Sequence, residues 1–233
     1  MEQQGKGTSF TSRMTKPETA GALLYLPIHI FLLPAIANTI LEKGVAEAAQ
    51  LNLYIYLIGL AYMLIVLGRF LRREFDPLCD RFLRCVIEVM TCCCLMLCLN
   101  LIAATALTVF GGIAENPNNE AIMEMADVEF GKISAIAIFL APIVEELMFR
   151  GGIFGFMRRY SRAAAYISSM LLFSLYHVWG YALEDPAYWI YIVQYLPVSY
   201  LLCRCYERSN TIWTSIFLHM LINGISIRAL SML

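Results

Sequence analysis

Long apolar runs constrain this chain more than any other feature of its sequence. A helix needs about 17 to 25 apolar residues to cross the ~30 Å of hydrocarbon in a bilayer. Runs of that length lie near 21–41, 51–69, 85–111, 133–157, 164–182, 188–205 and 212–230. Only 15% of the 233 residues are charged, whereas soluble domains carry about 25%. The sequence therefore predicts an all-α polytopic transmembrane bundle of about seven spans, with a range of about six to eight.

Basic residues near the ends of these runs predict an orientation, because Lys and Arg concentrate on the cytoplasmic side of a membrane. The N-terminal segment and every second connection after it are basic, with Lys6, Arg13, Lys16, Arg69, Arg72, Arg73, Arg81, Arg84, Arg158, Arg159, Arg162, Arg204 and Arg208. The connections between them are mainly acidic. We therefore expect an integral membrane protein with its N-terminus in the cytoplasm and its C-terminus outside.

The chain is expected to form one integrated membrane domain with three parts. Residues 1–20 are polar and are interpreted as a flexible cytoplasmic tail. Residues 21–130 hold the N-terminal helices with their connecting loops, and residues 131–233 hold the helices that carry the polar motifs. Apolar residues in the acidic connection 112–131 indicate that a short segment of it lies on the membrane surface. The connection is interpreted as a plain connector, with a lid as the alternative. No basic patch interleaved with aromatic residues predicts a nucleic-acid partner.

Three charged residues, Glu145, Glu146 and Arg150, lie inside the fourth apolar run. An ionisable group at the centre of a bilayer costs at least ~2.5–3.5 kcal/mol, so these groups need partners or a polar cavity. Glu146 and Arg150 are four residues apart and can pair on one helix face. Glu145 is rotated from Glu146 by about 100°. The spacing predicts a Glu146–Arg150 ion pair and a Glu145 side chain that faces an intramembrane cavity.

Two histidines in later runs have neighbours one helical turn away. Phe173 precedes His177 by four residues, and His219 precedes Asn223 by four, which puts each pair on one helix face. A rise of 1.5 Å per residue places these groups and Glu145 roughly 10–20 Å from the predicted cytoplasmic ends, in one layer. Taken singly, each polar residue is explained better by a contact that holds two helices together.

The combined set of polar groups suits hydrolysis of a peptide bond. A carboxylate beside an imidazole, as in Glu145 with His177, can hold and deprotonate a water molecule. A second imidazole and an amide, as in His219 with Asn223, are donors of the kind that stabilise an oxyanion. His29 in the first run belongs to none of these pairs and is interpreted as an interior histidine with satisfied hydrogen bonds. Glu88 and Asn100 are expected either to line the cavity or to pair with neighbours.

The motifs resemble the three signature motifs of the CPBP family of intramembrane endopeptidases, which includes the type II CAAX prenyl proteases and bacteriocin-processing or immunity proteins. The resemblance covers about residues 133–227 and rests on Glu145-Glu146-x-x-x-Arg150, Phe173-x-x-x-His177 and His219-x-x-x-Asn223. It implies that Glu145 and His177 activate a water molecule, and that His219 and Asn223 bind the oxyanion. The same resemblance gives supporting roles to Glu146, Arg150 and Phe173.

The resemblance implies a membrane-bound or lipidated peptide as substrate and the lipid bilayer as surroundings. A reaction without a cofactor is favoured. Zinc is the alternative, with Glu145, His177 and His219 as three ligands around an open fourth position. A non-proteolytic immunity or regulatory protein that binds a peptide or membrane partner is the alternative function, and a transporter or proton relay is a further one.

Overall fold

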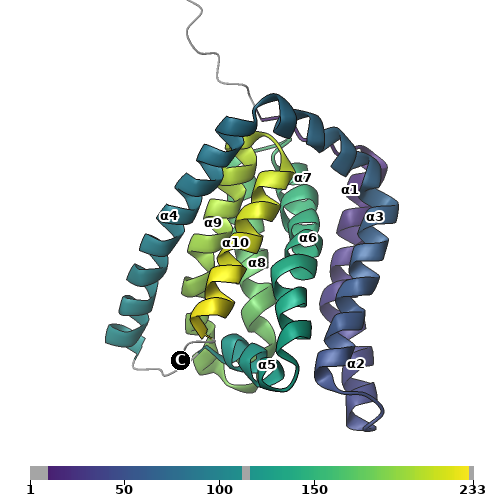
Figure 1. Cartoon of the computed structure of the whole chain (residues 1–233), viewed down its shortest axis with the longest axis vertical. Coiled ribbons are helices and arrows are strands. Elements are labelled where there is room, and N and C mark those ends of the chain that lie inside the picture. Colours follow the sequence, from purple (N-terminus) through teal and green to yellow (C-terminus); the bar gives the residue numbers. More distant parts are fainter. Residues whose placement is uncertain (1–9, 112–115, 231–233) are drawn as a thin grey trace, which may run out of the picture.

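The computed structural model describes residues 10–111 and 116–230, and within these ranges the chain is a bundle of helices without strands (Figure 1). The described residues form seven continuous helical rods. These rods are α1 (Lys16–Pro27) with η1 (Ile28–Leu32) and α2 (Leu33–Glu42); α3 (Ala48–Asp80); α4 (Phe82–Ala106) with η2 (Leu107–Gly111); α5 (Pro117–Ala135) with η3 (Ile136–Leu140), α6 (Ala141–Glu146), η4 (Leu147–Phe154) and α7 (Gly155–Met157); α8 (Arg162–Glu184); η5 (Pro186–Tyr191) with α9 (Ile192–Ser209); and α10 (Ile212–Leu230). The predicted all-α membrane bundle is confirmed.

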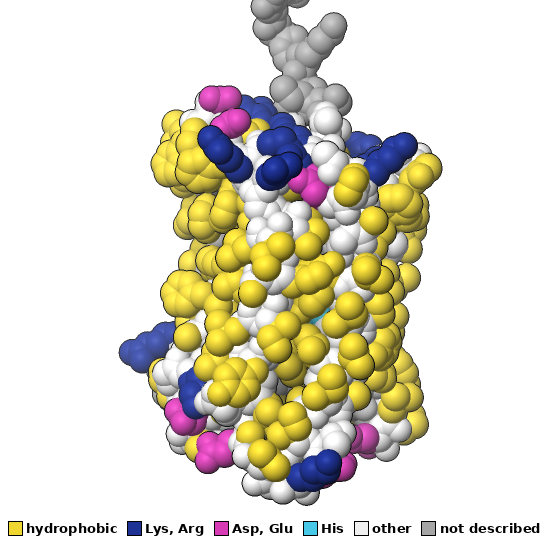
Figure 2. All heavy atoms as spheres, turned by 90° about the vertical axis from the view of Figure 1, so that its right-hand side faces the viewer, with side chains coloured by type: hydrophobic (Ala, Val, Ile, Leu, Met, Phe, Trp, Pro, Cys, Tyr) yellow, Lys and Arg dark blue, Asp and Glu magenta, His cyan; other side chains and the backbone are white. Residues whose placement is uncertain are grey.

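The outer surface of the bundle suits a lipid environment. By length and composition, four helices among the described residues are long and apolar enough to cross a membrane: Lys16–Glu42, Ala48–Asp80, Phe82–Val109 and Ile212–Ala229. Large apolar side chains such as Leu24, Ile65 and Leu101 are exposed on these helices. Figure 2 shows apolar side chains over the middle of one face and Lys and Arg side chains gathered at its upper end. The chain is therefore an integral membrane protein.

Prolines in the first rod interrupt its regular hydrogen bonding without ending it. Pro27 closes α1 and Pro34 lies in the first turn of α2, and the π-helical turn η1 lies between them. A proline has no N–H to donate and its ring displaces the preceding turn, so a local π or kinked geometry is the usual result. The first rod therefore continues past both prolines, and His29 lies buried in the π-helical turn between them.

The fourth rod lies in the interior of the bundle, because two glycines let the first rod approach its backbone. A Cβ atom on Gly151 would lie 2.8 Å from Cε of Met14, and one on Gly152 would lie 3.2 Å from Cβ of Ala22. Small residues at such contacts are what allow membrane helices to pack closely. The contact between α1 and η4 thus fixes the helix that carries Glu145.

The described part of the connection 112–131 is helical. A helix begins at Pro117, where the side chain of Asn116 accepts a hydrogen bond from N of Asn118 at 3.0 Å. It breaks at Glu129, where φ is −139° and ψ is 57°, so that the first part of α5 lies across the lower end of the bundle (Figure 1). The Asn116 amide also donates to Oε1 of Gln194 at 2.6 Å. Residues 112–115 lie outside the described residues.

The expected flexible tail at 1–20 is corrected for its described part, residues 10–20. The helix α1 begins at Lys16, because Thr15 and Glu18 form a capping box. Before it, the ring of Phe10 packs edge-on against Phe154 at 5.6 Å and Tyr206 at 4.9 Å between centroids. The polar composition of this segment gave no indication that Phe10 packs into the bundle or that a helix begins at Lys16. Residues 1–9 lie outside the described residues.

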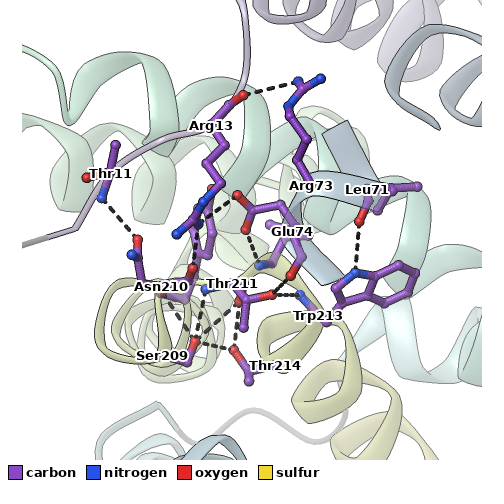
Figure 3. A network of polar contacts seen from close by, with 12 residues as sticks. Thr11, Arg13, Leu71, Arg73, Glu74, Ser209, Asn210, Thr211, Trp213 and Thr214 are labelled. Atoms are coloured by element: carbon purple, nitrogen blue, oxygen red, sulfur yellow. Dashed lines mark hydrogen bonds and ion pairs between the residues drawn. The ribbon is translucent and has the colours of Figure 1, made fainter. Parts of the chain in front are cut away.

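The carboxylate of Glu74 joins the N-terminal segment, α3 and the start of α10 (Figure 3). Its Oε1 lies 3.1 Å from Nη1 of Arg13, and its Oε2 accepts a hydrogen bond from N of Ile212 at 2.8 Å. The hydroxyl of Thr211 donates to the backbone oxygen of Glu74 at 2.6 Å. Arg13 also donates to the backbone oxygen of Asn210 at 2.7 Å. A buried acid therefore fastens three segments that are far apart in sequence.

We expect Glu74→Ala to lower the free energy of unfolding by about 2–3 kcal/mol, because the substitution removes the carboxylate partner of Arg13 and leaves a helix N-terminal N–H without its acceptor. Thermal unfolding of the purified protein in detergent measures the change. Asp76→Ala is the matched control, since Asp76 is an exposed acid on the same helix. Equal losses for the two variants would contradict the fastening role of Glu74.

Candidate active site

Glu145 meets two histidines from two other helices inside the bundle. Its Oε2 lies 3.9 Å from Nε2 of His177 in α8 and 3.9 Å from Nε2 of His219 in α10. Its Oε1 accepts a hydrogen bond from the hydroxyl of Tyr56 in α3 at 2.9 Å. The Glu145 side chain is buried. The structure thus brings together the carboxylate and imidazoles that the depth estimate placed in one layer.

Both imidazoles present Nε2 to Glu145 because their other nitrogen is already engaged. Nδ1 of His177 lies 2.9 Å from the backbone oxygen of Phe173, and Nδ1 of His219 lies 2.9 Å from Oε1 of Glu146. A carbonyl or a carboxylate only accepts, so Nδ1 carries the hydrogen in each ring. In a neutral ring Nε2 then has a free lone pair. Each histidine is therefore oriented to accept a proton or a hydrogen bond at Nε2.

The predicted ion pair between Glu146 and Arg150 is present and fully buried, with Oε1 and Nη1 3.1 Å apart. Two further hydrogen bonds support the pair. The hydroxyl of Ser215 donates to Oε2 of Glu146, and Nη2 of Arg150 donates to Oγ of Ser199 at 3.0 Å. The guanidinium lies 4.2 Å above the ring centroid of Phe173. Glu146 also holds His219, so the ion pair orients one of the site histidines.

Phe173 and Asn223 support the site from two sides. The Phe173 ring lies 4.5 Å from the ring of His177 and 5.3 Å from that of Phe149, between centroids. The amide of Asn223 donates one N–H to the backbone oxygen of Ala137 at 2.8 Å. That hydrogen bond fixes the amide and leaves its second N–H for another acceptor.

A cavity of about 820 Å³ contains the site. This volume is within the usual range of small-molecule and cofactor sites, roughly 300–1,000 Å³. Glu145, His177, His219, Asn223, Tyr56 and Asn100 are among its lining residues. Oδ1 of Asn100 is buried and has no hydrogen-bond partner among the described residues. Of the two alternatives for the unexplained polar residues, Asn100 therefore lines the cavity.

Glu88, in contrast, pairs with neighbouring residues, namely basic side chains of α9. Its Oε1 accepts a hydrogen bond from Nη1 of Arg204, and its Oε2 lies 3.4 Å from Nε of Arg208. A carboxylate within an apolar helix is tolerated when a partner of opposite charge neutralises it. This pair links α4 to α9 and takes no part in the Glu145 site.

Sequence reasoning did not identify Tyr56, Ser199 or Ser215 as site residues. Ser215 precedes His219 by four residues, so helical spacing alone would have placed it on the same face. Tyr56 and Ser199 carry no such signal, because each reaches the site from a helix without a motif. Their roles follow from how the helices pack.

The three groups proposed as zinc ligands converge, but at a wider spacing than zinc requires. Two ligands of tetrahedral zinc lie about 3.3 Å apart, given metal–ligand distances near 2.0–2.1 Å. Here Oε2 of Glu145 is 3.9 Å from each Nε2. Within residues 10–111 and 116–230, no three His, Cys, Asp or Glu side chains are grouped to hold a metal ion. As described, the carboxylate and the two imidazoles are spread more widely than the ligands of a bound zinc ion.

Comparison with known proteins identifies the part of the chain that carries the site. Residues 130–225 match the family model for type II CAAX prenyl endopeptidase Rce1-like proteins. Neither the curated proteins nor the solved structures gave a match. The matched residues include all three motifs and every charged or imidazole group around Glu145. Over this segment the chain is similar to the type II CAAX prenyl endopeptidases, and the match supports membership of the CPBP family.

Proposed function

We propose that this protein is an endopeptidase that hydrolyses a membrane-bound or lipidated peptide with a water molecule held between Glu145 and His177. The observation that carries the proposal is the pair of 3.9 Å separations between Oε2 of Glu145 and Nε2 of the two histidines, at the wall of an 820 Å³ cavity. A separation of this size leaves room for one water oxygen to contact the carboxylate and an imidazole together. Family membership supports proteolysis over transport.

In the proposed reaction, the water oxygen attacks the scissile carbonyl carbon while Glu145 takes a proton from the water. The free lone pair on Nε2 of His177 accepts the second hydrogen of that water and so orients the attack. When the carbon–nitrogen bond breaks, Glu145 returns its proton to the leaving nitrogen. The atoms balance without a covalent enzyme intermediate, so no serine or cysteine nucleophile is required.

The oxyanion that forms on the carbonyl oxygen needs hydrogen-bond donors. Asn223 offers its second amide N–H without any change of protonation, since the first is engaged with Ala137. His219 differs, because its Nδ1–H already faces Glu146. A donor role for Nε2 of His219 therefore requires a doubly protonated ring. We propose Asn223 as the principal donor and His219 as a second one in its charged form.

We also propose that the N-terminus lies in the cytoplasm and the C-terminus on the other side. Basic residues from four separate segments share one end of the bundle, where Arg13 pairs with Glu74 and Arg158 with Glu207 at 2.8 Å. The common end agrees with the rule that Lys and Arg concentrate on the cytoplasmic side.

The reaction is proposed to run without a metal ion, with zinc as the alternative. If zinc is present, Glu145, His177 and His219 would hold it, and it would supply an activated water. The hydrogen bonds to the Nδ1 atoms of both histidines orient their Nε2 atoms for either role. The choice between the metal-free and the zinc-dependent reaction therefore rests on the spacing of Glu145, His177 and His219.

We expect purified protein to cleave one or more members of a library of membrane-anchored and lipidated peptides, and His177→Ala to lower kcat on the order of 100-fold by removing the group that orients the water. A strong zinc chelator is expected to leave the wild-type rate unchanged. Mass spectrometry of the products measures cleavage, and thermal unfolding checks that the variant is folded.

Three outcomes would contradict parts of this proposal. Full activity of His177→Ala would remove that residue from the reaction. Loss of activity on chelation, restored by zinc, would replace the metal-free reaction with a zinc-dependent one. A wild-type protein that binds one peptide tightly and cleaves none would favour the non-proteolytic alternative.

A further inference from the structure

A continuous chain of hydrogen bonds connects Glu145 to the first helix. The hydroxyl of Tyr56 donates to Oε1 of Glu145 at 2.9 Å, and the hydroxyls of Tyr56 and Tyr176 are 3.1 Å apart. The hydroxyl of Tyr176 lies 3.2 Å from Nε2 of His29, and Nδ1 of His29 lies 3.4 Å from the hydroxyl of Tyr25. Four polar side chains from three rods thus form a chain of hydrogen bonds that ends at the proposed catalytic carboxylate.

His29 lies behind this site and does not touch the cavity. Tyr56 and Tyr176 line the cavity, whereas His29 is absent from the cavity wall among the described residues. Its side chain is only 2% exposed, and its ring packs edge-on against Tyr56 at 5.3 Å between centroids. The π-helical turn η1 holds it, and such turns occur frequently at functional sites. His29 also lies outside the matched segment 130–225.

The carboxylate at one end sets the direction of every hydrogen bond in the chain. An ionised Glu145 only accepts hydrogen bonds, so Tyr56 donates its single hydroxyl hydrogen to that carboxylate. The contact between the two tyrosines then requires Tyr176 to donate to Tyr56. Tyr176 has no hydrogen left, so Nε2 of His29 must donate to it. In a neutral ring Nδ1 is then the acceptor for Tyr25, which fixes the tautomer of His29.

We propose that His29 is a positioning residue for Glu145. By donating to Tyr176 it holds both tyrosine hydroxyls in the orientation that engages Oε1 of Glu145 and leaves Oε2 for the water between the histidines. The two site histidines and His29 thereby have opposite tautomers, since His177 and His219 carry hydrogen on Nδ1 and His29 carries it on Nε2. This inference rests on the proposed hydrolytic function for its kinetic consequences, but not for the tautomer.

The kinetic test compares two substitutions of similar size. His29→Leu cannot donate to Tyr176, whereas His29→Gln offers an amide N–H near the position of Nε2. We expect His29→Leu to lower kcat about tenfold with KM changed less than about twofold, since partners that orient a reacting group typically contribute 10–100-fold. His29→Gln is expected to stay within about threefold of wild type. Thermal unfolding is measured on both variants.

A double substitution separates positioning from a general packing effect. Once Tyr56→Phe has removed the last hydrogen bond to Glu145, the rest of the chain no longer acts on the carboxylate. We therefore expect His29→Leu added to Tyr56→Phe to lower kcat by less than about twofold further, as residues that act as a unit are non-additive. Additive losses, or equal activity of His29→Leu and His29→Gln, would overturn the proposal.

A second measurement is independent of activity. The chain has only three histidines, so nitrogen NMR of histidine-labelled protein in detergent gives few signals, and His29→Gln assigns those of His29 by their loss. We expect His29 to be neutral with hydrogen on Nε2, and His177 to carry hydrogen on Nδ1. Hydrogen on Nδ1 of a neutral His29 would overturn the inference. A wild-type protein that cleaves nothing yet shows the expected His29 tautomer would instead refute only the proposed function.

Discussion

Glu145→Gln is expected to lower kcat by about 10³-fold or more while leaving KM within a few-fold of wild type. Glutamine keeps the size of the side chain, and its amide oxygen can still accept the hydrogen bond from Tyr56. It cannot take a proton from water, so the group that acts as base and then as acid is lost. The cleavage assay with the best peptide from the library measures kcat and KM separately, and the loss should appear in kcat because the proton moves only in the transition state.

Two companion variants make this result specific. Glu145→Asp keeps a carboxylate but withdraws it by about one carbon–carbon bond, so we expect an activity between those of wild type and Glu145→Gln. Glu42→Gln removes a negative charge from an exposed position at the end of α2 and should leave kcat unchanged. If Glu145→Gln cleaved at more than one tenth of the wild-type rate, another group would have to be the base.

Helical periodicity was sufficient to predict the part of the site that lies within single helices. Glu146 and Arg150, at a spacing of four, form the predicted ion pair, and the calculated depths of Glu145, His177 and His219 agree with their contacts. These predictions succeeded because the spacing of residues on one helix, and its rise across a membrane of known thickness, are fixed by covalent geometry.

Contacts between distant rods could not be predicted in the same way. Tyr56 and Glu145 are 89 residues apart in sequence, and His29 and Tyr176 are 147 apart. Which face of one helix meets which face of another depends on small residues and side-chain packing that leave no periodic signal. The position of α5 was missed for the same reason, since it depends on the Asn116–Gln194 contact across 78 residues.

Breaking the buried ion pair should cause the largest loss of stability. We expect Arg150→Met to lower the free energy of unfolding by about 3–5 kcal/mol, because it leaves the Glu146 carboxylate buried without its cation. Arg150 is fully buried, so solvent does not replace the lost charge. Methionine fills much of the same volume, which makes loss of charge the main change. Thermal or denaturant unfolding in detergent measures the effect.

The same substitution should also disturb His219, because one oxygen of Glu146 contacts both Arg150 and Nδ1 of that ring. Arg150→Lys keeps the charge but loses the second arm that reaches Ser199, so we expect it to lose no more than about half as much stability as Arg150→Met. Arg228→Met is the control for removal of a positive charge, since Arg228 is exposed in the last turn of α10 and is not one of the residues that line the cavity. Equal stability of Arg150→Met and Arg150→Lys would mean that packing on Phe173, and not neutralisation of Glu146, is what Arg150 contributes.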